Sequence, residues 1–459
     1  MENWTRRKLL RAAVAVAGVL SLNPLRVLAQ STRKFTWKNW AGNLSSEPKN
    51  ITAPESEQAI IDLLKTSTGT VRPIGSGHSW AGLVPTDGTM ITLDGLMGLI
   101  SDDPETLQCE VWAGTKLFLF GPMLEEVGQA IQNMSDINYQ SLGGAIATST
   151  HGTGKELGSM SSFVKGMRLL TSGGDVIDCD ENNNSELLRS GIVSLGSMGV
   201  ITRMRFQNRE KHRLHQQEWL AHTDSVMEDI PSMARDNQQF ELFPLPNSDR
   251  TIVIVTNEAG PEEQDLIEDD PYAVNELREA FEFTRKIPGI KDFVYNHALD
   301  FAYGDAKHRI GPSYAVLAHP RVVRFAEMEY TVPAEQGVDC LRDVLATIRK
   351  NAANVGFPLE YRYVKADDSM IGMFSERDGC SISVHQFMDD PNWQDYLAMV
   401  EQVFHKYQGR PHWGKWHSLR GAQLAALYPH WGEFHKLRDE LDPQGRMLNP
   451  YLRQLFGKS

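Results

Sequence analysis

The order of apolar and polar positions along the chain predicts a mixed α+β protein. Between residues 51 and 210, helical runs, strand-like runs and glycine-rich turns follow one another. Thr52 and Glu55 have the spacing of a capping box, so we expect a helix to begin there, with an apolar face at residues 59–64. Strands are predicted where short apolar runs lie between turns, at residues 70–74, 90–93, 109–112 and 200–206.

The second half of the chain differs from the first. Beyond about residue 212 glycine becomes rarer, and residues 258–271 carry seven acidic side chains, which indicates a solvated loop or insert. Strands and helices alternate again from about residue 325, and residues 442–452 are expected to form a turn and an extended anchor. We therefore expect three parts after the N-terminal segment, at residues 30–212, 213–400 and 401–459, of which the last completes the first and closes the active site.

The first 29 residues predict an export signal. Arg6 and Arg7 precede a short apolar run at residues 12–22, and Ala29 is a small residue before a candidate cleavage point. The run is about half as long as a membrane span, so we expect no stable span after cleavage. The paired arginines resemble the twin-arginine class, whose cargo crosses the membrane already folded. The twin-arginine translocase and a periplasmic or extracytoplasmic location are therefore expected, with an amphipathic N-terminal helix as the alternative.

Composition and charge exclude several classes of function. The 459 residues include 46 Lys and Arg against 59 Asp and Glu, for a net charge of −13. A nucleic-acid surface needs clustered positive charge, so no nucleic-acid partner is expected. The four cysteines are widely spaced and form no CxxC pair, so the sequence contains no recognisable zinc module, and whether they pair after export stays open.

Three glycine-rich turns indicate a site for an anionic ligand. They lie at residues 75–79, 143–154 and 194–199, each beside a predicted strand. Successive backbone N–H groups in such turns form concave sites for anionic oxygens, and a nucleotide pyrophosphate is the ligand we expect. The common phosphate motifs are broken, because Trp80 ends the GxGxxG-like run and Glu156 follows Gly154-Lys155 where a P-loop needs Ser or Thr. The sequence therefore predicts a phosphate-binding domain of another design.

Four segments carry a resemblance to a known family. They are Arg72–Ser79, Asn133–Ile137 with the glycine cluster at 143–154, Ser194–Ile201, and His412–Lys415, in this order. They resemble the pyrophosphate loop, the second and third flavin-contacting segments and the HWxK motif of vanillyl-alcohol-oxidase-type flavoproteins, in the aldonolactone and alditol oxidase branch. The resemblance runs from about residue 35 to the end. It implies an α+β protein of two domains, in which a PCMH-type FAD domain precedes a substrate domain.

The resemblance also implies which residues contact FAD. His78 would bond covalently to the flavin 8-methyl carbon, which raises the reduction potential and prevents loss of the cofactor. A hydrogen-bonding histidine in a turn is the alternative. The other residues implied at the cofactor are Arg72, Ile74, Gly75, Ser76, Gly77, Ser79, Ser135, Asp136, Ile137, Gly143, Gly144, Thr148, His151, Gly152, Gly199 and Ile201.

Glu360, Arg362 and Lys415 are the candidate catalytic residues. Glu360 and Arg362 lie two apart in a strand-like run, so both project from one face. From the residues alone, a salt bridge on the protein surface is an equal alternative. The resemblance implies an active-site pair. Hydride transfer to flavin N5 leaves negative charge on the ring, which Arg362 and Lys415 would stabilise. Glu360 would orient the substrate hydroxyl and is the candidate base.

Two histidines are further candidates for the substrate pocket. His385 and His412 would line it, with a core or surface histidine as the alternative. His412 and His417 are five apart, a spacing that does not align two ligands on a helix, and no carboxylate stands beside them. We therefore expect no metal.

The expected function is FAD-dependent oxidation of a CH–OH group in a small polyol or sugar lactone. Ser135 stands where, in the resembling branch, a small residue accompanies fast reaction with oxygen and a bulkier one accompanies other acceptors. Serine is intermediate. We expect an oxidase that uses oxygen, and a dehydrogenase that uses a quinone or cytochrome stays open. A non-catalytic periplasmic carbohydrate-binding protein is the alternative of another class.

Overall fold

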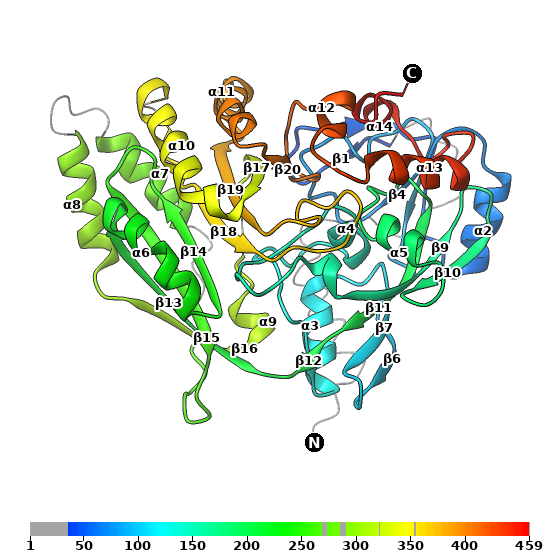
Figure 1. The fold of residues 1–459 in the computed structure, drawn as a ribbon, viewed down its shortest axis with the longest axis horizontal. Coiled ribbons are helices and arrows are strands. Elements are labelled where there is room, and N and C mark those ends of the chain that lie inside the picture. Colours follow the sequence, from blue (N-terminus) through cyan, green and yellow to red (C-terminus); the bar gives the residue numbers. More distant parts are fainter. Residues whose placement is uncertain (1–34, 269–272, 285–290, 321, 353–354, 459) are drawn as a thin grey trace. The chain divides into compact units, whose positions relative to one another are not determined.

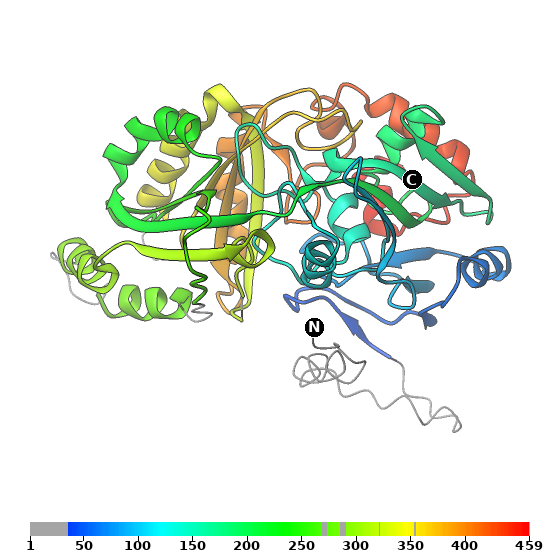
Figure 2. The ribbon, with the colours of Figure 1, turned by 90° about the horizontal axis from the view of Figure 1, so that it is seen from below.

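The computed structural model describes residues 35–268, 273–284, 291–320, 322–352 and 355–458. The export signal predicted at residues 1–29 lies outside these residues. Residues 36–459 form one unit, to which all the elements below belong. Within it two domains lie side by side, one around a large sheet and one around smaller sheets (Figures 1 and 2).

The first domain is built on two small sheets. A parallel sheet has the strand order β3–β5–β4, and an antiparallel sheet has the order β10–β9–β11–β7–β6. The strands are β3 (Asn50–Thr52), β4 (Val71–Ile74), β5 (Thr89–Thr92), β6 (Leu99–Asp103), β7 (Gln108–Trp112), β9 (Val164–Leu170), β10 (Val176–Asp180) and β11 (Val200–Gln207). All four strands predicted in this region are confirmed to within one residue at each end.

Short strand pairs and helices complete this domain. The strand pairs are β1 (Trp37–Lys38) with β2 (Ser45–Ser46), and β8 (Gln129–Ala130) with β12 (Arg209–Glu210). The helices are α2 (Glu57–Thr66), α3 (Leu117–Glu126), α4 (Leu142–Ala147), α5 (Ser185–Gly191), α12 (Gly421–Ala425), α13 (Trp431–Leu441) and α14 (Pro450–Leu455).

Two predictions of local structure, one helix start and one extended segment, are wrong. The first helix does not begin at Thr52, which ends β3. It begins after Ser56, whose Oγ accepts a hydrogen bond from the Ala59 N–H at 3.2 Å. The C-terminal tail is not extended, because the Asn449 side chain caps α14 by accepting from the Leu452 N–H at 2.9 Å. In both places the side chain that caps the helix N-terminus decides where the helix starts.

The C-terminal segment returns to the first domain. The Val71 N–H donates to the Arg446 carbonyl at 2.9 Å, and Asn449 Nδ2 donates to the Gly82 carbonyl at 2.8 Å. Figures 1 and 2 both place the red C-terminal helices over this domain. The boundary expected at residue 400 falls inside α11 (Trp393–Lys406), which packs on the second domain's sheet.

The second domain is built on one antiparallel sheet. Its strands, in spatial order, are β16 (Lys307–Pro312), β13 (Arg213–His222), β15 (Arg250–Glu258), β14 (Gln239–Pro244), β18 (Glu360–Val364), β19 (Gly379–Phe387), β17 (Phe325–Pro333) and β20 (Arg410–Pro411). The helices are α6 (Thr223–Asp236), α7 (Ala273–Thr284), α8 (Lys291–Tyr303), α9 (Ser313–Val316), α10 (Gly337–Asn351) and α11.

The two faces of this sheet have opposite characters. Apolar side chains such as Val253, Met328 and Ile382 belong to the main core, and α6, α10 and α11 pack against this sheet. The alternate residues project to the other face, which we call the front face and which carries Gln216, Glu218, Glu241, Phe243, Ile252, Ile254, Glu327, Glu329, Glu360, Arg362, Ser381, Ser383 and His385. All nine residues of β17 are buried, so its polar side chains on the front face are also withdrawn from water.

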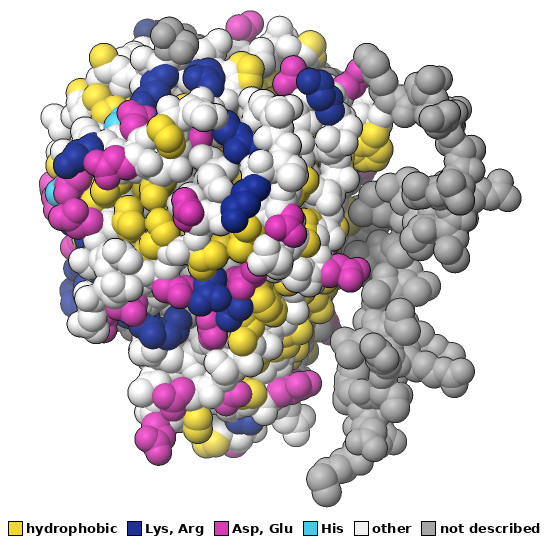
Figure 3. Space-filling model, turned by 90° about the vertical axis from the view of Figure 1, so that its right-hand side faces the viewer, with side chains coloured by type: hydrophobic (Ala, Val, Ile, Leu, Met, Phe, Trp, Pro, Cys, Tyr) yellow, Lys and Arg dark blue, Asp and Glu magenta, His cyan; other side chains and the backbone are white. Residues whose placement is uncertain are grey.

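Surface charge, membrane spans and cysteines were also subjects of the sequence-based expectations. On the face drawn in Figure 3, basic and acidic side chains are interspersed with apolar ones. Within the described ranges, none of the helices is both long and apolar enough to cross a bilayer. Each of the four cysteines, at positions 109, 179, 340 and 380, is a buried free thiol.

Candidate active site

Two adjoining cavities lie where the first domain meets the front face. The larger, of about 590 Å³, is lined by first-domain residues such as His78 and Ser135 and by front-face residues such as Glu360 and Arg362. The smaller, of about 120 Å³, is lined by the three glycine-rich turns. His78, Ser79, Gln140 and Thr148 line both cavities. The turns predicted to bind one ligand are therefore brought together in space.

The glycine-rich turns approach each other more closely than side chains would allow. A Cβ on Gly75 would lie 2.3 Å from the Ser141 Oγ, and that hydroxyl caps α4 by accepting from the Gly144 N–H at 3.4 Å. Gly77 has a φ of +72°, a conformation that glycine adopts without strain. The smaller cavity is thus walled largely by backbone, as a pyrophosphate site requires.

Almost all the residues predicted at the cofactor line one of these cavities. The smaller is lined by Arg72, Ile74, Gly75, Ser76, Gly77, His78, Ser79, Gly143, Gly144, Thr148, Gly199 and Ile201. The larger is lined by Ser135, Asp136, Ile137 and His151, together with His78, Ser79 and Thr148. Gly152 lines neither cavity and packs closely against the chain, since a Cβ there would lie 2.3 Å from the Met134 carbonyl oxygen.

Arg72 holds the glycine-rich region together through its side chain. Its buried guanidinium donates to the carbonyls of Leu83 at 3.0 Å, Leu195 at 2.6 Å, Gly196 at 2.7 Å and Met447. Burial lowers the pKa of Arg72 to about 9. Four of its five N–H groups bind carbonyls, so its side chain joins the third turn to the C-terminal segment. Direct contact between Arg72 and the cofactor stays a prediction.

His78 is partly buried and has an unused ring nitrogen. Its imidazole stacks between Trp40, at a ring distance of 5.4 Å, and Tyr139, at 6.3 Å. Its Nδ1 is buried without a hydrogen-bond partner, and so is the Oγ of Ser76 two residues before it. Burial lowers the pKa of His78 to about 4, helped by the charge of Lys116, so the ring is neutral at pH 7. A backbone-walled cavity with two orphaned polar atoms fits FAD, and the covalent bond to His78 stays a prediction.

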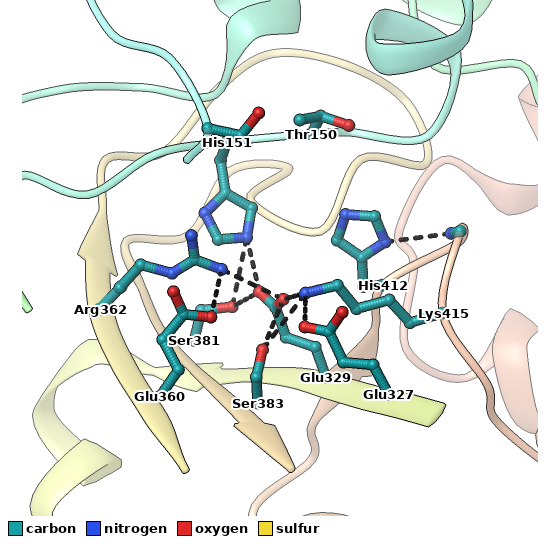
Figure 4. A network of polar contacts seen from close by, with 12 residues as sticks. Thr150, His151, Glu327, Glu329, Glu360, Arg362, Ser381, Ser383, His412 and Lys415 are labelled. Carbon is teal, nitrogen blue, oxygen red and sulfur yellow. Dashed lines mark hydrogen bonds and ion pairs between the residues drawn. The ribbon is translucent and has the colours of Figure 1, made fainter. Parts of the chain in front are cut away.

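The opposite wall carries a buried network of charges around Glu329 (Figure 4). Glu329 has no solvent exposure, and it accepts hydrogen bonds or ion pairs from His151 at 2.6 Å, Ser383 at 2.8 Å, Arg362 at 3.3 Å, Ser381 and Lys415. Burial alone would raise the pKa of Glu329, but Lys415, His151 and Arg362 hold it well below the usual value. Glu329 is therefore a permanent anion that fixes the groups around it.

Lys415 binds two glutamates of the same strand. Its ammonium donates to Glu327 and Glu329, and lies 3.3 Å from the Ser383 Oγ. Burial would lower the pKa of Lys415, but Glu327 and Glu329 raise it above its usual value. Burial likewise opposes ionisation of Glu327, whose pKa Lys415 and His385 nonetheless lower to about 2. The three groups are therefore ionised at neutral pH.

Glu360 and Arg362 form the predicted pair, and both are buried. Arg362 Nη2 lies 3.2 Å from Glu360 Oε2, while the buried Nε of Arg362 has no partner. Burial raises the pKa of Glu360, the charge of Arg362 opposes this, and the charges of Asp136 and Glu329 add to the rise. Glu360 is thus the carboxylate of the network that takes up a proton most readily.

The two histidines predicted in the pocket both line the larger cavity. His385 Nδ1 lies 2.9 Å from the Pro358 carbonyl, and its Nε2 lies 3.2 Å from Glu327. His412 Nδ1 accepts from the Gly414 N–H at 3.0 Å, so its ring proton resides on Nε2. Burial lowers the pKa of His412 to about 3, with Lys415 adding to the effect, so His412 is a neutral hydrogen-bond donor.

One group of the network has metal-ligand spacing. Atoms of Glu327, Glu360 and His385 lie within 4.8 Å of one another. The Lys415 ammonium already binds Glu327 and supplies the positive charge there. The expectation that no metal binds stays a prediction.

Four residues of this network were not predicted from the sequence. Glu327 and Glu329 alternate with apolar residues on β17, and Ser381 and Ser383 alternate on β19. The signal was the same i, i+2 spacing that singled out Glu360 and Arg362: two acids in an otherwise apolar strand.

Comparisons with known proteins agree with this geometry. The D-arabinono-1,4-lactone oxidase family matches residues 204–455, and an FAD binding domain family matches residues 48–180. The chain is 32% identical over 437 residues to the L-gulono-1,4-lactone dehydrogenase of Mycobacterium tuberculosis, covering 92% of this chain and 99% of that protein. It is 25% identical over 430 residues to the L-gulonolactone oxidase of Bos taurus, covering 92% and 98% of the two chains.

More distant proteins also match over almost the whole chain. The chain is 24% identical over 427 residues to an alditol oxidase of Streptomyces sp., covering 91% of this chain and 98% of that protein. Among solved structures, a solvent-stable cholesterol oxidase matches with a TM-score of 0.78 at 16% identity, covering 92% and 97% of the chains, which shows a common fold. The predicted α+β two-domain fold is confirmed. The chain belongs to the D-arabinono-1,4-lactone oxidase family of FAD-dependent oxidoreductases.

Proposed function

We propose that this enzyme oxidises a CH–OH group of an aldonolactone or alditol, with FAD bonded covalently to His78. One observation carries the proposal. The unpartnered Nδ1 of His78 and the buried cluster of Glu360, Arg362 and Lys415 line the same cavity from opposite domains. A redox cofactor held at the first wall would expose its ring to a substrate held at the second. The names of the lactone and alditol relatives support the substrate class.

The residues of the front face have separable roles in this proposal. When bound, FAD supplies two-electron oxidation. Glu360 accepts the proton of the substrate hydroxyl, and the unpartnered Nε–H of Arg362 is a donor available to the substrate oxygen. Lys415 and Arg362 supply positive charge from buried positions, where charge acts more strongly than in water. His412 Nε2–H is a further donor to a substrate hydroxyl.

Glu329 supports these roles without touching the substrate. Its carboxylate is saturated by donors from His151, Arg362 and Lys415 and by two serines. Because it holds both cations in place, they need no reorganisation when negative charge develops. Since His151 belongs to the first domain, the same carboxylate also ties the two walls of the cavity together.

Oxygen is the electron acceptor we propose, and a dehydrogenase is the second candidate. The 32% identity to a protein named as a dehydrogenase favours the second. Ser135 lines the larger cavity, and its Oγ donates to the Ile137 carbonyl at 2.9 Å. The test is to measure oxygen uptake and reduction of a quinone analogue on the same preparation. If the enzyme is a dehydrogenase limited by Ser135, the Ser135→Gly variant gains oxygen activity while its rate with the quinone analogue is unchanged.

The experiment that tests the covalent bond is acid denaturation of the purified enzyme. We expect yellow colour to precipitate with the chain, and to remain in the supernatant for His78→Ala. His435→Ala is the matched control, because His435 also has unpartnered ring nitrogens but lines neither cavity. Colour that stays in solution for the unmodified protein would refute the covalent role of His78. A folded protein without flavin would refute the enzyme proposal.

We also propose that residues 1–29 direct export through the twin-arginine translocase. The paired basic residues Arg6 and Arg7 before an apolar run support this. Replacing both by lysine is expected to retain the protein in the cytoplasmic fraction, measured by immunoblot of periplasmic and cytoplasmic extracts. Undiminished periplasmic protein in that variant would contradict the proposal.

A further inference from the structure

The larger cavity extends well beyond the catalytic cluster. The strand register aligns Arg362 with Glu241, Glu241 with Ile254, Ile254 with Glu218, and Glu218 with Lys307. All five of these residues line the cavity. Because neighbouring strands lie about 4.8 Å apart, this row runs about 19 Å across the sheet from the catalytic arginine.

The far end of this row is also far from His78. Trp40 stacks on His78 at 5.4 Å and contacts Phe325 at 5.5 Å. Phe325 belongs to β17, which lies beyond β18 in the direction opposite to β13, β15 and β16. The proposed site of FAD attachment and the far end of the row therefore lie on opposite sides of Glu360 and Arg362.

One small sugar unit fills only part of this length. A five- or six-carbon unit with bonds of about 1.5 Å spans roughly 6 Å. Placed at Glu360 and Arg362, it leaves more than two strand spacings of cavity floor beyond it. We call this remaining part the distal floor, formed by Gln216, Glu218, Ile252, Ile254 and Lys307.

The distal floor combines hydrogen-bonding groups with an apolar surface. Gln216 is only 3% exposed. Its Nε2 donates to Thr256 Oγ1 at 3.4 Å, whereas its buried Oε1 has no hydrogen-bond partner. Glu218 accepts from the Tyr303 hydroxyl at 2.9 Å, and its carboxylate lies 3.8 Å from the Lys307 ammonium. Ile252 and Ile254 are buried between these polar groups and Glu241.

This combination fits a sugar ring. Hydroxyl groups both donate and accept, so they satisfy an unpartnered amide and a carboxylate, while the C–H face of a ring packs on branched apolar side chains. A purely apolar ligand would leave the buried Oε1 of Gln216 without a hydrogen bond, which costs free energy of binding.

We propose that the distal floor is a second subsite, which binds a further sugar unit attached to the unit that is oxidised. The substrate class is then a lactone or alditol bearing a glycosyl group, rather than a single unit. This inference rests on the proposed function, since it places the oxidised unit at Glu360 and Arg362.

The test compares matched short and long probes. Sorbitol and glucono-1,5-lactone are the short probes, and maltitol and lactobionolactone each add one sugar unit to them. With an artificial electron acceptor, kcat/KM for at least one long probe is expected to exceed that of its short counterpart at least about tenfold. Glu218→Gln is expected to lower the long-probe value about tenfold, chiefly through KM, and to leave the short-probe value within about twofold.

Two further variants make the test specific. Ile254→Phe places bulk on the distal floor without changing charge, and is expected to affect only the long probes. Glu228→Gln, on the exposed side of α6, is the matched control and is expected to change neither. Flavin content and melting temperature show that each variant is folded.

The possible results separate this inference from the proposed function. If long probes have no advantage over short ones, or if Glu218→Gln slows both equally, the second subsite is refuted. If a flavin-loaded enzyme oxidises none of the probes, the proposed substrate class fails instead. The subsite is then decided by calorimetric titration with maltitol: binding that weakens about tenfold in Glu218→Gln supports it, and no binding overturns it.

Discussion

The two walls of the active-site cavity are built by different means. The first-domain wall consists largely of backbone in glycine-rich turns, with few ionised side chains, as at Gly75 and Gly144. The front face of the second domain carries ionised side chains at alternate positions of neighbouring strands, as at Glu329 and Arg362, and the segment after β20 adds Lys415. The first wall suits a cofactor that every turnover reuses, and the second suits a substrate whose charge changes during reaction.

The difference also predicts how each wall fails. Backbone turns tolerate no added side chain but are insensitive to pH, because their N–H groups do not titrate. The charge network tolerates changes in shape but not the loss of one partner, since a buried ion left alone is costly. Four predictions test this contrast, from the largest effect to the smallest.

Lys415→Met should have the largest effect. It leaves Glu327 and Glu329 buried without their ammonium partner, so we expect unfolding to become about 3–5 kcal/mol easier and kcat/KM to fall at least about 100-fold. Denaturant titration and steady-state kinetics measure both. Lys436→Met, on the exposed face of α13, is the control. A Lys415→Met enzyme of normal stability would show that the two carboxylates do not depend on this cation.

Gly75→Ala should damage only the first wall. Its Cβ would meet the Ser141 Oγ at 2.3 Å and displace the hydroxyl that caps α4. We expect a loss of about 1–3 kcal/mol in stability and a lower flavin-to-protein absorbance ratio. Gly432→Ala, in the helix α13 with open space around it, is the matched control and should gain about 0.5–1 kcal/mol. Normal flavin content in Gly75→Ala would contradict the close approach of the turns.

The pH dependence of activity should report on the second wall alone. Burial raises the pKa of Glu360 above its usual 4.5, and the proposed base must be deprotonated to act. The acidic limb of kcat/KM should therefore have its midpoint above 4.5, with activity rising as pH rises through it. In Glu360→Gln this limb should vanish along with most activity. A limb that persists unchanged in that variant would assign the titration to another group.

The smallest effect is expected in stability at acid pH. The pKa of Glu327 is about 2 in the folded protein, against 4.5 for a glutamate in the unfolded chain. Its contribution to folding stability is therefore complete above pH 4.5 and is lost as pH falls toward 2. Glu327→Gln should flatten the free energy of unfolding between these limits, measured by urea titration at several pH values. An identical pH profile in the variant would show that Glu327 does not carry this linkage.

Sequence reasoning recovered the backbone-built wall better than the charged one. Glycine clusters mark turns directly, and the strands around them follow from local apolar runs, so these elements were placed to within one residue. The start of the first helix was misplaced because the sequence offers two capping residues, Thr52 and Ser56, and Thr52 instead pairs with Ile91 in the β3–β5 ladder. A local pattern does not contain that strand pairing.

Within the charge network, two residues were predicted to form a pair only where they are close in sequence. Glu360 and Arg362 stand two residues apart, and family resemblance drew attention to them. Glu329 instead pairs with Lys415, 86 positions later, and with His151, 178 positions earlier. Two acids in a strand ordinarily indicate a solvated face, and only the assembled sheet reveals that this face is closed.

The link from Arg72 to Met447 has a consequence for biosynthesis. The cofactor loop is synthesised early, yet its guanidinium binds a carbonyl near the end of the chain. While the ribosome still holds those last residues, this side chain lacks one of its four carbonyl partners. A carboxy-terminal truncation or fusion would therefore act on cofactor retention, at a distance of 375 residues along the chain.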